Sequence, residues 1–216
     1  KVPFVDLKSQ YKNIKKDINK SIFNVIKETA FIGGKYVNTF KTKFQKEYDI
    51  KHCIPVANGT DAIYITLKML GVGKGDEVIT TATSWISTSE TISQTGAKPV
   101  FVDIDPDYYT IDHTKIREKI TKNTKAIIPV HLYGQMADIN YINSICQENN
   151  LFMIEDCAQS HFSELNGILA GKTGIASTFS FYPGKNLGAY GDAGCVITND
   201  DKLAKKILMY SNHGAL

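Results

Sequence analysis

Hydrophobic residues recur along the chain with two different spacings. Over residues 7–25, apolar positions return every three or four residues between lysines and asparagines, which predicts an amphipathic helix. A second helix is predicted over 37–48. From residue 53 onward, short continuous apolar runs predict strands at 53–57, 77–81, 99–103, 125–130, 151–155, 178–181 and 195–198. The helices between them are expected at 62–70, 85–94, 112–120 and 138–149.

This alternation of strands and helices predicts an α/β fold. Continuously apolar strands are typical of a mostly parallel sheet with helices on both faces, built from right-handed βαβ units. A ligand in such a fold binds at the carboxyl ends of the strands. We expect one large domain preceded by an N-terminal segment, together covering residues 1–216, and we find no internal repeat.

Composition narrows the classes of function. The chain is 43% hydrophobic and 22% charged with a net charge of +3, which is too small a charge to indicate a nucleic-acid partner. No apolar run is long enough to predict a membrane span, and the N-terminus lacks a signal-peptide pattern. The cysteines are far apart without a CxxC pair, so we expect reduced thiols in a cytoplasmic protein and no metal. They are Cys53, Cys146, Cys157 and Cys195.

The segment 177–199, STFSFYPGKNLGAYGDAGCVITN, carries the first candidate for chemistry. Lys185 lies in a short loop between two predicted strands, directly after Phe181-Tyr182-Pro183-Gly184. Burial disfavours a charged amine, and a desolvated lysine of lowered pKa can attack carbonyl groups. The alternative is a solvated lysine at the tip of a surface hairpin.

Two further candidates follow strands. Asn58-Gly59-Thr60-Asp61 joins a strand to a helix, and such a helix start can bind phosphate, although a plain N-cap turn is the alternative. Asp156 ends a strand, and a buried carboxylate there needs a cation or several donors. A protonated pyridine nitrogen would be such a cation, whereas a helix cap is the alternative. Gln159 could reach the same ligand, and the role of His161 stays open.

Other features have competing explanations. Trp85 could be a platform for an aromatic ring or a core residue. The run 167–173, GILAGKT, resembles a Walker A loop but has one residue too few between its glycines, which disfavours a P-loop nucleotidase. A nucleophile pair of Cys157 and His161 is possible but lacks an orienting third group.

Taken together, the chain resembles the DegT/DnrJ/EryC1/StrS family of sugar aminotransferases. These are pyridoxal 5'-phosphate (PLP) enzymes of the aspartate aminotransferase fold, so the resemblance implies the large PLP-binding domain of fold type I. The matching segments occur in the family's order over essentially the whole chain. They are FVDLKSQY, FIGG, VANGTDA, GDEVITT, GAKPVFVDIDP, PVHLYGQ, IEDCAQSHF and SFYPGKNLGAYGDAGCVITND.

The resemblance implies a role for each residue of the cofactor site. Lys185 would be catalytic, forming the Schiff base with PLP, and Asp156 would pair with the pyridinium nitrogen. Gln159 would contact the phenolic oxygen of the ring, and Trp85 would stack on its face. The phosphate would be held by Gly59, Thr60 and Ser180.

The resemblance also implies the reaction and the partners. An amino group would move from an amino acid, expected to be glutamate, to a nucleotide-linked keto-sugar, in a homodimer whose subunits share residues. The family continues into a smaller C-terminal domain, which we expect to be absent from this chain. A dehydratase branch replaces the lysine with histidine, so Lys185 favours the aminotransferase branch. The alternatives are a PLP-dependent lyase, desulfurase or dehydratase and a non-catalytic binding module of the same fold.

Overall fold

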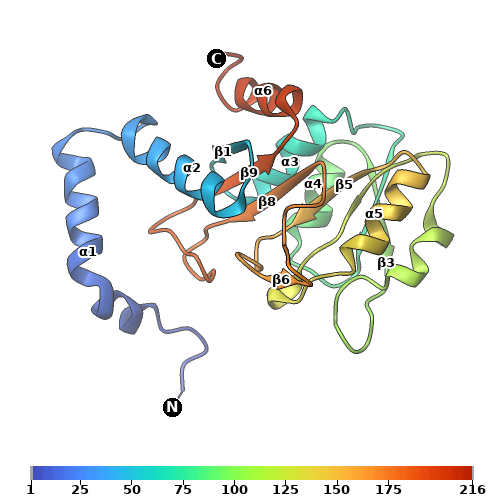
Figure 1. Ribbon diagram of the computed structural model, residues 1–216, viewed down its shortest axis with the longest axis horizontal. Coiled ribbons are helices and arrows are strands. Elements are labelled where there is room, and N and C mark those ends of the chain that lie inside the picture. The colour runs from blue at the N-terminus through green and yellow to red at the C-terminus, as the bar shows by residue number, and fades with distance from the viewer. Residues whose placement is uncertain (1, 216) are drawn as a thin grey trace.

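A computed structural model describes residues 2–215 and has a seven-stranded sheet at its centre (Figure 1). Across the sheet the strands follow the order β1-β9-β8-β5-β4-β2-β3. Their bounds are β1 His52–Val56, β2 Glu77–Thr81, β3 Lys98–Val102, β4 Thr124–Ile128, β5 Phe152–Asp156, β8 Ala176–Ser180 and β9 Gly194–Thr198.

The sheet is mostly parallel, which confirms the predicted fold class. Each neighbouring pair from β3 through β2, β4 and β5 to β8 is parallel. Only β9 runs in the opposite direction, since it pairs antiparallel with both β8 and β1. The carboxyl ends of the six strands other than β9 therefore lie along one edge.

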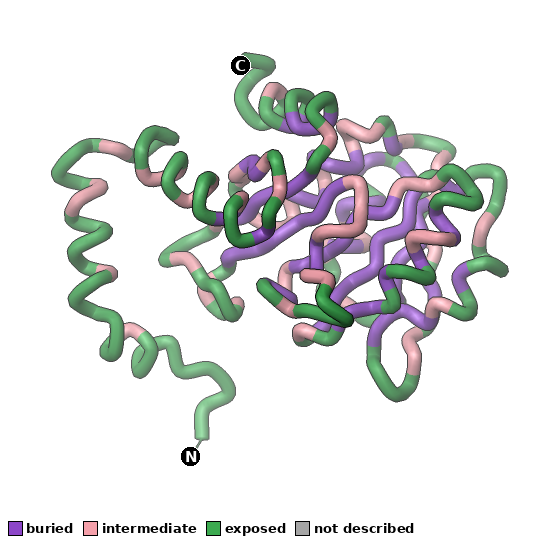
Figure 2. Tube along the Cα trace, in the orientation of Figure 1, coloured by how far each residue is buried: buried purple, intermediate pink, exposed green. Residues whose placement is uncertain are grey.

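Helices cover both faces of the sheet. Their bounds are α1 Leu7–Lys27, α2 Gly34–Tyr48, α3 Gly59–Met69, α4 Ser87–Gln94, α5 Ile139–Glu148 and α6 Asp201–Tyr210. Side chains of α2 and α5 share two core clusters on one face, whereas α3, α4 and α6 pack on the other. Neighbouring residues of one strand separate between these faces: Val78 packs with α3 and α4, and Ile79 packs with α5. The buried trace in Figure 2 follows the strands.

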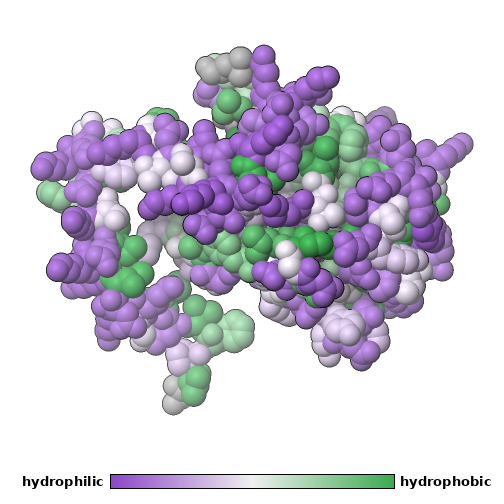
Figure 3. Space-filling model, viewed as in Figure 1, coloured by the Kyte–Doolittle hydropathy of each residue, from purple (hydrophilic) through white to green (hydrophobic). Residues whose placement is uncertain are grey.

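The first helix, α1, stands apart from this layered body (Figure 1). It confirms the predicted amphipathic pattern, yet none of its residues is buried. The ring of its Tyr11 lies near that of Tyr190, with ring centroids 6.3 Å apart. Figure 3 shows α1 carrying apolar side chains among its charged ones. Within residues 2–215, no helix combines the length and apolar character that a membrane crossing requires.

The helix predicted over 112–120 was wrong. The chain makes two short 3-10 turns there, at His113–Lys115 and Arg117–Lys119. The Asp112 carboxylate accepts hydrogen bonds from the backbone N–H and the hydroxyl of Thr114, only two residues ahead. This local bonding favours a tight turn over an α-helical start.

Candidate active site

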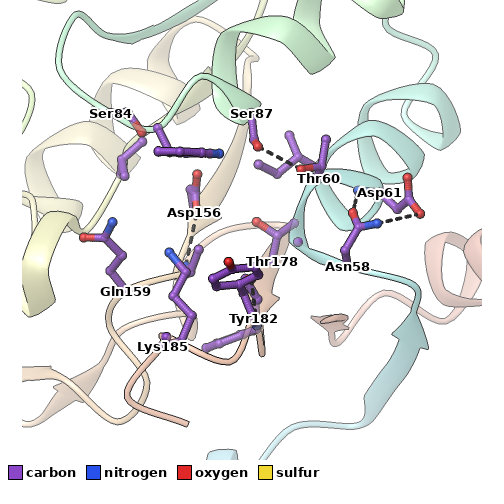
Figure 4. A pocket seen from close by; sticks show the side chains of 18 of the residues that line it. Asn58, Thr60, Asp61, Ser84, Ser87, Asp156, Gln159, Thr178, Tyr182 and Lys185 are labelled. Atoms are coloured by element: carbon purple, nitrogen blue, oxygen red, sulfur yellow. Dashed lines mark hydrogen bonds between the residues drawn. The ribbon is translucent and has the colours of Figure 1, made fainter. Parts of the chain in front are cut away.

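A cavity of about 710 Å³ opens at the carboxyl ends of the strands, where the fold predicts a ligand. All seven site residues predicted from the sequence line this cavity. They are Gly59, Thr60, Trp85, Asp156, Gln159, Ser180 and Lys185. Figure 4 shows Lys185, Asp156 and Gln159 on one side of this cavity and Asn58 and Thr60 on the other.

The start of α3 forms one end of the cavity. Asn58 caps this helix, because its Oδ1 accepts the backbone N–H of Asp61 at 2.8 Å. The plain N-cap interpretation is thus correct for Asn58, but the cap satisfies only one of the free donors at a helix start. In the part of the chain that the structure describes, the N–H groups of Gly59 and Thr60 meet no acceptor. They remain available, at the positive end of the helix dipole, for an anion.

Glycine at position 59 allows this helix start to approach β8. A Cβ at 59 would lie 2.6 Å from the Cβ of Ser180, far inside any real contact. Gly194, the first residue of β9, faces the same turn, since a Cβ there would lie 2.4 Å from the carbonyl group of Asn58. The two glycines therefore bring the N–H groups of α3 beside the hydroxyl of Ser180.

Asp156 ends β5 and is buried at the base of the cavity. Its Oδ1 accepts the Ala158 N–H at 3.1 Å and its Oδ2 accepts the Thr88 hydroxyl at 2.9 Å. Burial raises the pKa of this carboxyl, and the hydrogen bonds and the charge of Lys185 oppose that rise. The helix-cap alternative does not apply, because no helix begins directly after Asp156.

Lys185 is half-buried in the loop between β8 and β9, not extended at a hairpin tip. Desolvation lowers its pKa, although the charge of Asp156 opposes this shift. The loop is fixed around it: the Lys185 N–H donates to the Tyr182 carbonyl at 2.8 Å. Next to it, Asn186 Oδ1 lies 2.7 Å from Nδ1 of the buried His161. His161 thus helps to fix the loop that carries Lys185.

Gln159 has a defined amide orientation. Its Oε1 accepts the backbone N–H of Tyr133 at 2.8 Å, so its NH₂ group is the part left for a ligand. Tyr133 adopts a left-handed conformation with φ of 54°, which is uncommon for a residue with a side chain. A strained backbone thus presents the N–H that orients Gln159.

Trp85 is not a core residue. It is 72% exposed and lies in the turn between β2 and α4, where its ring borders the cavity. An aromatic ring exposed beside a cavity is free to pack against the flat face of a ligand.

A buried pair lies behind the site. His131 Nδ1 accepts the Ala137 N–H, so its ring proton lies on Nε2, which is 3.0 Å from Glu155 Oε2. Backbone N–H groups of Gly171, Thr173 and Gly174 complete the partners of the carboxylate. The segment that resembles a Walker A loop therefore donates N–H groups to a carboxylate of the same chain, that of Glu155.

Cys157 does not fit the role of a nucleophile. It is fully buried, and burial raises its pKa well above the usual value, which leaves an unreactive thiol. Its sulfur lies near His131 and Glu155, a group of three potential metal ligands. The Glu155 oxygens already accept the hydrogen bonds described above, so this cluster is a structural network.

Sequence reasoning missed Ser87 and Thr88 in the first turn of α4. Ser87 Oγ lies 2.8 Å from Thr60 Oγ1, and Thr88 binds Asp156. The run of serines and threonines over 84–91 gave no clear signal, because helical hydroxyl groups usually bond nearby backbone carbonyls, as those of Ser89 and Thr91 do. The partners were not evident, since Asp156 is 68 residues from Thr88.

Relatives share this sequence across almost its full length. The chain is 48% identical to the "Pleiotropic regulatory protein" of Geobacillus stearothermophilus, covering 99% of this chain and 58% of that protein. It is 43% identical to a UDP-2-acetamido-2-deoxy-3-oxo-D-glucuronate aminotransferase of Pseudomonas aeruginosa, covering 99% and 59%. The chain thus spans less than two thirds of the length of these relatives.

Solved structures share the fold. DesV of S. venezuelae, in complex with a ketimine intermediate, superposes with a TM-score of 0.95 at 37% identity, over 99% of this chain and 58% of that one. NtdA from Bacillus subtilis with the bound cofactor PMP gives 0.91 at 37%, over 98% and 48%. An E. coli GDP-4-keto-6-deoxy-D-mannose-3-dehydratase with hydrated PLP gives 0.83 at 31%, over 88% and 50%.

A family model matches residues 12–216, nearly the whole length, and its segments include the cavity residues described above. The fold, the relatives and this match agree. The chain belongs to the DegT/DnrJ/EryC1/StrS aminotransferase family, whose members depend on PLP.

Proposed function

We propose that this chain is the cofactor-binding domain of an aminotransferase that moves an amino group from an amino acid, glutamate, to a nucleotide-linked keto-sugar. The observation that carries the proposal is the meeting of Lys185, Asp156 and the free N–H groups of α3 in one cavity. The reactions named for relatives such as the P. aeruginosa aminotransferase support this choice of substrate class.

The residues present fit PLP. A phosphate would be held by the N–H groups of Gly59 and Thr60 and by the hydroxyls of Thr60 and Ser180, since an anion suits a helix start. The free NH₂ of Gln159 suits the phenolic oxygen, as an amide donor meets an oxygen acceptor.

Asp156 and Trp85 fit the pyridine ring of PLP. Asp156 would hold a proton on the ring nitrogen, because a cation relieves the cost of burying its carboxylate. Trp85 would pack on the face of the ring.

The chemistry then divides between cofactor and protein. When bound, PLP supplies an electron-withdrawing ring that stabilises the charge left at the donor's α-carbon. Lys185 would bind PLP covalently and, once displaced by the amino donor, would move the proton between the α-carbon and C4′ of PLP. Its lowered pKa suits this task, because only the neutral amine accepts a proton.

The surface of α1 supports a proposed homodimer. Its exposed apolar side chains, which include Phe23 and Ile26, have little to cover them within one chain. We place them against a second copy of the chain in a homodimer, because exposed apolar patches mark interaction sites.

We place the protein in the cytoplasm, where free cysteines persist; cell fractionation checks this location.

The proposal is tested by the first half of the reaction. Glutamate added to the complete, PLP-loaded protein should convert the absorbance spectrum to that of the amine form and release 2-oxoglutarate. Addition of a nucleotide-linked keto-sugar should then restore the first spectrum. A spectrum that glutamate leaves unchanged would contradict the proposal, and formation of an unsaturated or deaminated sugar would indicate a lyase or dehydratase. Failure to bind PLP would indicate a non-catalytic module.

A further inference from the structure

Two hydroxyl groups lead from the cavity to Asp156: that of Ser84, just before α4, and that of Thr88, in the first turn of α4. Ser84 Oγ lies 3.1 Å from Thr88 Oγ1, and Thr88 Oγ1 donates to Asp156 Oδ2 at 2.9 Å. Ser84 is half-buried and borders the cavity, whereas Thr88 is only 1% exposed. The contact joins a helix on one face of the sheet to the end of β5.

An ionised Asp156 fixes the direction of these hydrogen bonds. An ionised carboxylate only accepts, so the single proton of the Thr88 hydroxyl goes to Asp156. Ser84 must then donate to the oxygen of Thr88. The result is a one-way chain from Ser84 through Thr88 to Asp156.

Thr88 departs from the bonding of the next threonine along α4. The Thr91 hydroxyl is equally buried, but it bonds the carbonyls of Ser87 and Thr88 within its own helix. This internal bond is the usual choice for a helical threonine. The Thr88 hydroxyl instead crosses to a buried acid in the candidate site.

The surroundings of Asp156 make this donor important. Burial favours the protonated carboxyl. Opposing it are the Ala158 N–H, the Thr88 hydroxyl and the charge of Lys185. Without the Thr88 hydroxyl, Oδ2 of Asp156 would lose the hydrogen bond that it accepts from the protein. A carboxyl group that has become neutral cannot hold a proton on a pyridine nitrogen.

We propose that Thr88 is a positioning residue, which keeps Asp156 ionised and aimed at the ring nitrogen of PLP, with Ser84 orienting the Thr88 hydroxyl. This inference rests on the proposed PLP-binding function. Thr88 itself touches neither the cofactor nor the substrate in this account.

The test uses the complete protein loaded with PLP that carries ¹⁵N in the ring, because the ¹⁵N chemical shift reports ring protonation directly. Wild type should show a protonated ring nitrogen. Thr88→Val should move the signal toward that of neutral pyridine and weaken PLP binding by about tenfold, the size expected for a hydrogen bond to a charged group. Thr88→Ser should restore both, and the matched control Thr91→Val should behave as wild type.

The outcomes separate the inference from the function. A wild-type ¹⁵N shift in Thr88→Val, with the fold intact by circular dichroism, would overturn the inference. Thr88→Ala removes the same hydroxyl without placing a methyl group against the carboxylate, so it answers the question if the valine variant does not fold. A neutral ring in the wild type would overturn it as well. Absence of PLP binding in the wild type would overturn the proposed function, and with it the inference.

Discussion

At the scale of single residues, the site depends on close approach rather than on side chains alone. Gly59 places the start of α3 against Ser180 at a distance that a Cβ would not permit. Gly194 does the same for the Asn58 carbonyl from the other side. The candidate phosphate site is thus formed by backbone groups that two glycines allow to meet.

Gly59→Ala should therefore damage this end of the cavity. The added methyl would lie 2.6 Å from Ser180 Cβ, so α3 or β8 must shift. We expect a loss of about 1–3 kcal/mol in the free energy of unfolding, as for overpacked cores, and weaker PLP binding. Denaturant titration and a PLP titration of the complete protein measure the two effects.

Gly73→Ala is the matched control for this substitution. Its Cβ would meet only the Thr95 carbonyl, at an ordinary 3.7 Å, and should leave PLP binding unchanged. Equal PLP affinity in the two variants would contradict the role given to Gly59.

At the scale of elements, one buried acid ties several segments together. Glu155 on β5 binds His131, which follows β4. It also accepts the N–H groups of Gly171, Thr173 and Gly174, which precede β8. Burial raises the pKa of Glu155, but these hydrogen bonds outweigh it and hold the pKa below its ordinary value of 4.5. Because Asp156 is the next residue, this network also fixes the base of the cavity.

Glu155→Gln should cost about 1–3 kcal/mol of unfolding free energy at neutral pH, since its NH₂ group would face N–H donors. A folded-state pKa below the unfolded value means that the carboxylate stabilises the fold above pH 4.5. That stabilisation is lost as the pH falls through the folded-state pKa. The gap between wild type and variant should therefore narrow in acid, as measured by denaturant titration across pH.

Exposed Glu164, in the hairpin between β5 and β8, provides the control for this prediction. Glu164→Gln should leave the free energy of unfolding nearly unchanged at every pH. The role given to Glu155 would be contradicted if wild type and Glu155→Gln had equal free energies of unfolding at neutral pH. It would also be contradicted if their difference stayed constant as the pH falls.

The sequence predicted the sheet well because buried parallel strands are short, continuous apolar runs. Residues such as Asp156, placed directly after such a run, could be assigned to the carboxyl edge. The segment 112–120 was predicted wrongly because an aspartate that caps a helix and one that closes a tight turn look alike in sequence. Thr88 was missed because its partner is distant in the chain. The exposure of Trp85 likewise depends on which segments cover it, and sequence spacing does not show this.

At the scale of the whole molecule, the layered body and α1 differ in how far their apolar side chains are buried. The body buries apolar side chains on both faces of its sheet, whereas α1 leaves Leu7, Ile22, Phe23 and Ile26 exposed. A helix with an uncovered apolar side gains stability when a partner covers it.

We expect Phe23→Glu combined with Ile26→Glu to convert a dimer of the complete protein to monomers, because a charge at a buried interface is costly. Light scattering coupled to size-exclusion chromatography gives the molar mass. Lys20→Glu, on the same helix, should leave the dimer intact. A wild-type protein that is monomeric, or a double variant that stays dimeric, would contradict the role of α1.

The proposed function depends on Lys185 as the residue that binds the cofactor. The most direct measurement is borohydride reduction of the complete protein with PLP, followed by peptide mass spectrometry. We predict a single phosphopyridoxyl group on Lys185 and none in Lys185→Ala. No adduct, or an adduct on another lysine while Lys185 stays free, would contradict it.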